Sequence, residues 1–263
     1  MNVNGGSKAD VSINMCGVRV DKYSFEQVVN IITTHAAAST QPKYVVTPNA
    51  HHIVTLQRDG HFRKIYREAF LSVADGVPLL WAARFLGTPL RGRVNGTDLF
   101  EQLCEVAAEK QLSVFLLGGR PGAAQMAAKV LTNRHPSLNI VGTYCPPYGF
   151  ESDAIEVARI NQMIRSAKPH LLFVGLGAPK QEYWMYEHCQ EIGVPVSLGI
   201  GVSFEFVAGA VKRAPRWMQK LGLEWLFRFI SEPKRLWQRY LVGNAVFVWL
   251  VVKQKLSSSF QTS

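Results

Sequence analysis

Short hydrophobic runs alternate with amphipathic stretches along most of the chain. The runs cover residues 13–20, 43–46, 71–74, 113–117, 139–144, 171–174 and 195–199. Each has the length of a strand that is buried on both faces, as in a parallel sheet. Between the runs, apolar residues recur at helical spacing, as Ile160, Met163, Ile164 and Ala167 do. This alternation predicts an α/β fold, a Rossmann-like parallel sheet with helices on both faces.

The same pattern predicts where the helices begin and end. We expect helices over 25–35, 51–69, 77–85, 98–110, 123–133 and 152–168, the second broken near Asp59 and Gly60. Ser24 and Gln27 have the spacing of a capping box for the first helix. Thr97 is placed to cap the helix over 98–110.

Residues 171–182 combine a buried strand, a glycine turn and a helix start. Gly175 and Gly177 allow a tight turn, and Pro179 suits the first turn of the helix that follows. Such a turn presents backbone N–H groups at the carboxyl edge of the sheet, where phosphates commonly bind. Similar turns occur in many α/β proteins, so a purely structural role stays open.

Polar residues follow three of the predicted strands, at 47–49, 75–76 and 177–181. The carboxyl ends of parallel strands face the ligand crevice, so these residues could converge there. Asp75 is notable because a buried strand delivers it to the rim of the sheet. It could be a catalytic carboxylate or an N-cap of the following helix, and the pattern alone leaves both readings open.

Composition changes near residue 210, which divides the chain into three parts. Residues 1–10 are polar and are expected to be a flexible N-terminus, and 11–209 form the α/β core. The whole chain has a formal net charge of +10. Most of this positive charge lies from Val211 onward, where ten Lys and Arg accompany only two Glu. Basic residues alternate there with Trp and Phe, as in helices at a membrane interface. We therefore predict a helical, basic C-terminal appendage over 210–263, near a membrane, docked on the core, or both.

Missing motifs exclude several functions. No DxD pair, metal-ligand histidine spacing, GxxxxGK[ST] loop or GxSxG elbow is present. Gly175 and Gly177 lack the third glycine of a dinucleotide fingerprint, so a nucleotide-dependent oxidoreductase is weakly supported. A non-catalytic membrane or anion-binding module remains an alternative, but no nucleic-acid motif accompanies the basic tail. The four cysteines form no CxxC pair, and the polar start and the short apolar run 245–252 indicate neither a signal peptide nor a membrane span.

Several segments together resemble the WecG/TagA/CpsF glycosyltransferases, glycosyltransferase family 26. The matching segments are TPN at 47–49, ADGV at 74–77, RVNGTDL at 93–99, FLLGG at 115–119, VGLGAPKQE at 174–182, VKRAP at 211–215 and GLEWLFR at 222–228. They occur in the order of the family and extend over most of 11–240. Residues 201–206 depart from it, because many relatives carry a second glycine and an Asp there.

The resemblance implies an inverting, metal-independent transferase that moves a sugar from a UDP-sugar to a polyprenyl-diphosphate-linked saccharide. N-acetylmannosamine, its uronic acid and glucose all occur among the donors of the family. Asp75 matches the proposed general base. The substrate-binding positions implied by the resemblance or by the phosphate-type turns are Thr47, Asn49, Arg93, Gly118, Gly119, Gly177, Lys180, Gln181, Arg228, Arg235 and Arg239.

The resemblance also implies where the protein works and what it meets there. Its place would be the cytoplasm, at the inner face of the cytoplasmic membrane, in the assembly of bacterial surface polysaccharide. The expected partners are the UDP-sugar and the lipid-linked acceptor, with no nucleic acid. Whether the chain forms a homo-oligomer is left open.

Overall fold

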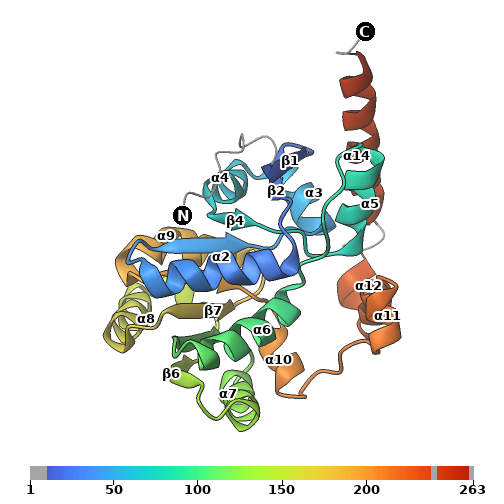
Figure 1. Cartoon of the computed structure of the whole chain (residues 1–263). Helices are drawn as coiled ribbons and strands as arrows, with labels where there is room; N and C mark the ends of the chain where they lie inside the picture. Colours follow the sequence, from blue (N-terminus) through green and yellow to red (C-terminus); the bar gives the residue numbers. More distant parts are fainter. Residues whose placement is uncertain (1–10, 238–241, 261–263) are drawn as a thin grey trace.

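A six-stranded parallel sheet forms the centre of the protein (Figure 1). The structure is a computed structural model that describes residues 11–237 and 242–260. The strands are β3 (Lys43–Val46), β4 (Leu71–Ser72), β5 (Ser113–Gly118), β6 (Asn139–Tyr144), β7 (Leu171–Gly175) and β8 (Val196–Gly199). They lie side by side in the order β4-β3-β8-β7-β5-β6. All neighbours are parallel, so the loops that follow the strands share one edge.

Helices cover both faces of the sheet, as the alternating pattern predicts. One face carries α2 (Phe25–Ala38), α6 (Gly96–Glu109), α7 (Ala123–Arg134) and α10 (Ser203–Val207). The other carries α3 (Ala50–Arg58), α4 (Gly60–Glu68), α5 (Val77–Phe85), α8 (Ala154–Ala167) and α9 (Lys180–Ile192). Each face has its own cluster of buried apolar side chains. The predicted α/β fold is therefore confirmed.

The N-terminal run departs from the prediction of a single strand over 13–20. It forms an antiparallel hairpin of β1 (Ser12–Met15) and β2 (Val18–Asp21) outside the main sheet. Cys16 and Gly17 make the turn between them, with φ of 52° and 83°. Gly17 is a typical turn residue, but the apolar residues on both sides of the turn make the segment resemble one continuous strand.

Two further boundaries also differ from the sequence expectation. β4 ends at Ser72, but Val73 still donates its N–H to the Val46 carbonyl, so the chain continues along β3 to the rim. Helix α6 begins at Gly96 with Asn95 as its N-cap, and the prediction of Thr97 as the cap is wrong. The Thr97 hydroxyl instead lies 2.9 Å from that of Ser203, which joins the start of α6 to α10.

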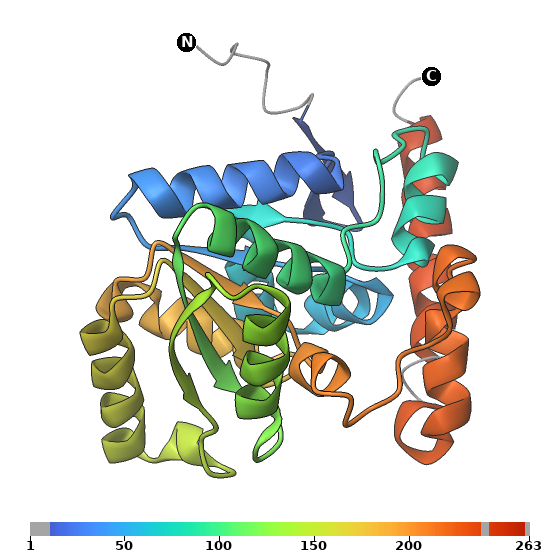
Figure 2. The same cartoon turned by 60° about the horizontal axis from the view of Figure 1, so that its bottom comes forward.

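The C-terminal residues form helices at one side of the sheet. They are α11 (Arg216–Lys220), α12 (Glu224–Ser231), α13 (Pro233–Trp237) and α14 (Gly243–Phe260). Figures 1 and 2 both place α14 beside α5, with α11 and α12 close to its start. Phe247 and Val251 of α14 are buried against the core, and the Gln254 side chain bonds to the backbone of the β1–β2 hairpin. The last helix is thus docked on the core.

The first testable prediction concerns the close contact between the ends of β5 and β7. Gly118 has a φ of +102°, and a Cβ there would lie 2.8 Å from the Gly175 carbonyl carbon and oxygen. Gly118→Ala should therefore lower the free energy of unfolding by about 2–4 kcal/mol, from backbone strain and overpacking together. Gly60→Ala is the matched control, because a Cβ at Gly60 meets nothing within 4 Å. Denaturant unfolding measures both, and equal stability of the two variants would contradict this account.

Candidate active site

Asp75 lies at the carboxyl edge of the sheet, three residues after β4 ends at Ser72. Its backbone N–H donates to the Pro48 carbonyl at 2.8 Å, and the neighbouring Ala74 carbonyl accepts from Val94 at 2.9 Å. These bonds attach the Asp75 segment to the loop after β3 and to the loop before α6. The Asp75 side chain is partly buried, and its Oδ1 accepts from Asn95 Nδ2 at 3.0 Å. Two other loops therefore hold the Asp75 backbone, and Asn95 holds the carboxylate itself.

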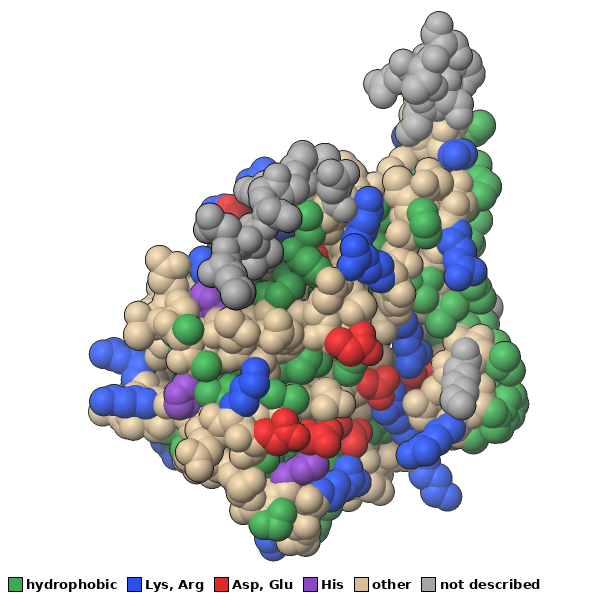
Figure 3. All heavy atoms as spheres, in the orientation of Figure 1, with side chains coloured by type: hydrophobic (Ala, Val, Ile, Leu, Met, Phe, Trp, Pro, Cys, Tyr) green, Lys and Arg blue, Asp and Glu red, His purple; other side chains and the backbone are tan. Residues whose placement is uncertain are grey.

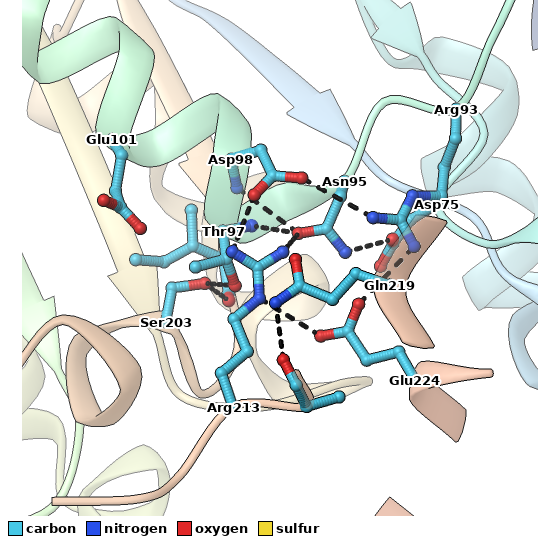
Figure 4. Close-up of polar contacts among 12 residues, drawn as sticks. Asp75, Arg93, Asn95, Thr97, Asp98, Glu101, Ser203, Arg213, Gln219 and Glu224 are labelled. Atoms are coloured by element: carbon cyan, nitrogen blue, oxygen red, sulfur yellow. Dashed lines mark hydrogen bonds and ion pairs between the residues drawn. The ribbon is translucent and has the colours of Figure 1, made fainter. Parts of the chain in front are cut away.

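Asn95 contacts several groups at the start of α6 (Figure 4). Its Oδ1 accepts from the backbone N–H groups of Thr97 and Asp98, at 3.0 and 3.3 Å. The same oxygen accepts from Arg213 Nη2 at 3.2 Å. Because the oxygen faces donors, the amide N–H groups of Asn95 remain for Asp75.

Four charged side chains form a closed ring beside Asn95 (Figure 4), which we call the ion ring. Arg213 Nη1 lies 2.6 Å from Asp98 Oδ1, and Arg213 Nε lies 3.3 Å from Glu224 Oε1. Arg93 completes the ring, 3.4 Å from Glu224 Oε2 and 3.6 Å from Asp98 Oδ2. Arg93 and Asp98 lie just before and within α6, whereas Arg213 and Glu224 lie within 210–263, the predicted appendage. The ion ring therefore links the start of α6 to the C-terminal segment.

The surroundings of Asp75 raise the pKa of its carboxyl to about 6. Burial is the largest cause, since the charged form is taken out of water, and the Glu224 carboxylate raises the pKa further. Arg93, the Asn95 hydrogen bond and Arg228 lower it, in that order. Near neutral pH such a carboxylate is mostly ionised yet basic enough to accept a proton, which suits a general base.

Thr47 and Asn49 lie at the same corner as Asp75. Asn49 caps α3 by accepting the His52 N–H at 3.1 Å, and its Nδ2 lies 3.3 Å from His52 Nε2. A Cβ built on Gly76 would lie 4.0 Å from that of Asn49, and one on Gly96 would lie 4.0 Å from Thr47 Oγ1. The ends of β3 and β4 thus bring these predicted site residues together.

Gln181 and Lys180 make contacts that support neighbouring loops. Gln181 is buried, and its Oε1 accepts the Gly201 N–H at 3.0 Å while its Nε2 donates to Glu182 at 2.9 Å. It therefore holds the loop after β8. Lys180 pairs with Glu151 at 2.7 Å, so it ties the start of α9 to the loop after β6.

The three predicted site glycines have different surroundings. Gly118 and Gly119 lie against β7, and the Gly119 N–H donates to the Gly175 carbonyl at 2.9 Å. Gly177 has a φ of +77°, and a Cβ there would meet nothing within 4 Å, so its side of the turn is open.

The three predicted tail arginines are described to different extents. Arg228 of α12 is close enough to Asp75 to lower the pKa of that carboxyl. Arg235 belongs to α13, but its side chain lies outside the described part of the structure. Arg239 lies outside the described residues altogether.

The sequence reasoning did not assign Asn95, Asp98, Arg213 or Glu224 to the site. All four fall within segments that carry the family resemblance, at 93–99, 211–215 and 222–228. Their roles depend on contacts between residues more than 110 positions apart, such as Arg213 with Asn95. Glu205 was also missed; it is 5% exposed and accepts the Arg120 N–H at 2.9 Å.

A cleft of about 440 Å³ lies between α6, α7 and α11. Asp98, Glu101 and Glu105 line one side of it, and Arg213 and Arg216 of the appendage also line it. Figure 3 shows acidic side chains gathered on this face of the molecule, with Lys and Arg next to them. Opposite charges therefore face each other where the appendage meets the core.

The described residues hold neither a membrane-spanning helix nor a metal-binding cluster of side chains. Within 11–237 and 242–260, no helix combines the length and apolar character needed to cross a membrane. Over the same ranges, His, Cys, Asp and Glu do not gather in groups of three or more that could hold a metal ion.

The pKa of Asp75 can be measured by a carboxyl NMR titration. We expect a midpoint of about 6 in the wild type. Arg93→Ala should raise the midpoint, because a cation that favours the ionised form is lost. Glu224→Gln should lower it, because a neighbouring anion is lost. Arg134→Ala, which removes an exposed pair with Glu101, is the control. A wild-type midpoint near 4, as for an ordinary aspartate, would refute the account.

Comparison with known proteins identifies the family. The sequence profile of the Glycosyl transferase WecG/TagA/CpsF family matches residues 13–261. The chain is 30% identical over 244 residues to an N-acetylglucosaminyldiphosphoundecaprenol N-acetyl-beta-D-mannosaminyltransferase of Staphylococcus aureus strain MW2, covering 92% of this chain and 93% of that protein. Its counterpart in strain COL has the same identity and coverage. The chain therefore belongs to the WecG/TagA/CpsF family of glycosyltransferases.

Proposed function

We propose that this protein transfers N-acetylmannosamine from a UDP-sugar to a polyprenyl-diphosphate-linked N-acetylglucosamine, with inversion at the anomeric carbon. The observation that carries the proposal is Asp75, a partly buried carboxylate with a pKa of about 6 and arginines nearby. The names of the Staphylococcus aureus relatives support the choice of sugar and acceptor. Family membership decides against the oxidoreductase and the non-catalytic module.

Inversion requires a single displacement. Asp75 accepts the proton of the acceptor hydroxyl while that oxygen forms a bond to C1 of the sugar. The bond between C1 and the UDP oxygen breaks on the opposite face, and its electron pair leaves with UDP. General-base assistance of this kind typically contributes about 10²–10⁴-fold to the rate. The remaining work is to stabilise the charge that develops on the leaving diphosphate.

Arginines of the core and appendage are suited to that second task. Arg93 and Arg228 both act on Asp75 electrostatically, so their positive charge lies near the reacting groups. Arginine binds phosphate oxygens through paired N–H donors, and donors fixed in advance stabilise a developing anion. We include Arg235 and Arg239 as further candidates for this role. On this proposal arginines replace the metal ion that other transferases use, and a chelator should leave transfer unchanged.

The remaining predicted residues would bind substrate around this centre. Thr47 and Asn49 lie at the Asp75 corner, where they could contact the sugar or the acceptor. Gly118, Gly119, Gly177, Lys180 and Gln181 follow β5 and β7 and would form the nucleotide side of the site. In this arrangement the nucleotide lies over the middle of the sheet edge, and the acceptor approaches from the appendage.

Replacement of the base gives a direct test of the reaction. Asp75→Asn should lower kcat by about 10²–10⁴-fold and leave the affinity for the UDP-sugar nearly unchanged, because the amide keeps the shape but cannot accept the proton. The assay supplies UDP-N-acetylmannosamine, its uronic acid and UDP-glucose to a lipid-linked acceptor and detects the product by mass. Asp153→Asn, at an exposed helix cap, is the control. Wild-type turnover in Asp75→Asn would remove Asp75 as the base.

The appendage and α5 expose large apolar side chains that suit a membrane interface. Those at least 47% exposed are Trp81 and Phe85 of α5, Trp217, Leu221, Ile230 and Trp237 of α11–α13 and nearby turns, Val242 before α14, and Val248, Trp249 and Leu256 of α14. Figure 3 shows hydrophobic side chains along the outer edge of this side. Lys253 lies over the Trp249 ring, 5.2 Å from its centroid. Tryptophan with neighbouring cations is typical of proteins that lie on anionic bilayers.

We propose that 210–263 and α5 together hold the protein at the inner face of the cytoplasmic membrane. Trp81→Ala and Trp249→Ala should each weaken binding to vesicles that contain anionic lipid, and the double variant should bind least. Ile155→Ala, at an exposed apolar residue of α8, is the control. Flotation with and without a competing oligonucleotide measures the effect. Wild-type flotation of the double variant, or displacement by the oligonucleotide, would contradict membrane docking.

A further inference from the structure

The appendage reaches the proposed base through one amide side chain. Arg213 connects the ion ring to Asn95 Oδ1, and Asn95 Nδ2 donates to Asp75 Oδ1. A continuous path of hydrogen bonds and ion pairs thus runs from α12 to the carboxylate (Figure 4). Nothing in the family match assigns a role to this path.

The orientation of the Asn95 amide is determined by its partners. Its oxygen accepts from three N–H donors, two from the start of α6 and one from Arg213. A flip of the amide would turn its NH₂ group toward those donors and its oxygen toward the Asp75 carboxylate. In the flipped amide, both contacts would lose hydrogen bonds and bring like partial charges together. Only the observed orientation is therefore favourable.

The ion ring has the burial needed to act as a docking contact. The side chains of Arg93, Arg213 and Glu224 are 17%, 18% and 12% exposed, and that of Asp98, the outer member of the ring, is 40% exposed. Partly buried pairs are screened less by water and salt than surface pairs, and loss of one member leaves its partner charge uncompensated. A ring of this kind favours a single position of the appendage on the core.

Gly222 adds a steric constraint to the same contact. A Cβ at Gly222 would lie 2.5 Å from Val77 Cγ2, so the turn before α12 packs directly against the first residue of α5. Val77 is two positions after Asp75. The appendage is therefore fitted closely to the segment that carries the carboxylate.

We propose that Asn95 is the positioning residue for the Asp75 base, and that the appendage fixes Asn95 through Arg213. This inference rests on the proposed function, in which Asp75 accepts the acceptor proton. The carboxylate is held in its productive direction when the ion ring is closed. Undocking of the appendage therefore weakens both the charge environment and the orientation of the base.

Asn95→Asp separates a positioning role from a capping role. Aspartate caps a helix as well as asparagine, so α6 should keep its start in Asn95→Asp, and a fall in kcat would not come from loss of the cap. With a positioning role, a carboxylate oxygen replaces the N–H donor that faces Asp75. The kcat should then fall roughly 10- to 100-fold. The acidic limb of the kcat/KM profile should move roughly one pH unit or more upward, because a second anion disfavours ionisation of Asp75.

Several other described groups also influence the ionisation of Asp75, and hence the pH profile. These are Arg93, Glu224 and Arg228. The buried Tyr66 of α4 also interacts with Asp75: burial raises the pKa of Tyr66 most, and the charges of Glu182 and Asp75 raise it further. None of them is changed in Asn95→Asp. A shift of the acidic limb in this variant therefore reports the charge placed beside Asp75, and the fall in kcat reports the loss of the N–H donor that faces it.

A double-variant cycle tests the link to the appendage. Arg213→Ala and Asn95→Asp are measured singly and together in the full chain, with Arg134→Ala as the control for loss of an arginine–carboxylate pair on α6. If Arg213 acts through Asn95, the loss of kcat in the double variant is smaller than the product of the single losses. Losses that multiply would overturn the coupling.

Asp75→Asn in the same assay distinguishes a failure of this inference from a failure of the proposed function. If Asp75→Asn is inactive while Asn95→Asp keeps the wild-type kcat and pH profile, the positioning role is overturned and the base assignment stands. If Asp75→Asn keeps wild-type turnover, the proposed function loses Asp75 as its base, and the positioning role falls with it. A shifted profile in Asn95→Asp together with an inactive Asp75→Asn supports both.

Discussion

The structure depends on keeping one carboxylate partly out of water and still able to ionise. Burial raises the pKa of Asp75, and Arg93, Asn95 and Arg228 partly reverse that effect. Two of these come from the loop before α6 and its cap, and the third comes from the C-terminal appendage. The balance therefore requires both parts of the protein in one arrangement. A pKa of about 6 is the outcome of that balance and not a property of any single contact.

The fold supplies the positions that this balance requires. In a parallel sheet the strand ends and the loops after them meet at one edge, so Thr47, Asn49 and Asp75 come together from β3 and β4. The appendage then covers the β4 side of this edge, held by the ion ring and by the fit of Gly222 against Val77. The same appendage exposes tryptophans on its outer side. The appendage thus lies between Asp75 and the membrane surface to which we propose that the protein binds.

Much of the fold could be predicted from the sequence because each element carries a local signal. The capping box at Ser24 and the break at Asp59 were read correctly, and the strands of the main sheet follow the hydrophobic runs. The hairpin at Cys16 and Gly17 and the cap at Asn95 were missed, since apolar residues on both sides of the turn resemble one continuous strand and Thr97 is also a good cap. Asp75 could be singled out because a buried strand leads directly to it.

The contacts of the site could not be predicted in the same way. Arg213 and Asp98 are both ordinary charged residues in the sequence, and only the fold shows that they lie 2.6 Å apart. Gln181 and Lys180 were expected to bind substrate, and the structure shows that each also supports a loop. Whether these residues contact substrate stays a prediction. Pairings across more than a hundred residues leave no periodic signal in a single sequence.

The central claim is that the appendage completes the site around Asp75. The most direct measurement is sugar transfer by a chain that ends at Ala210, with circular dichroism and thermal unfolding to show that the core remains folded. The account predicts a folded core that forms no detectable product, because Arg213, Glu224 and Arg228 are gone. Transfer at the rate of the full chain would contradict it.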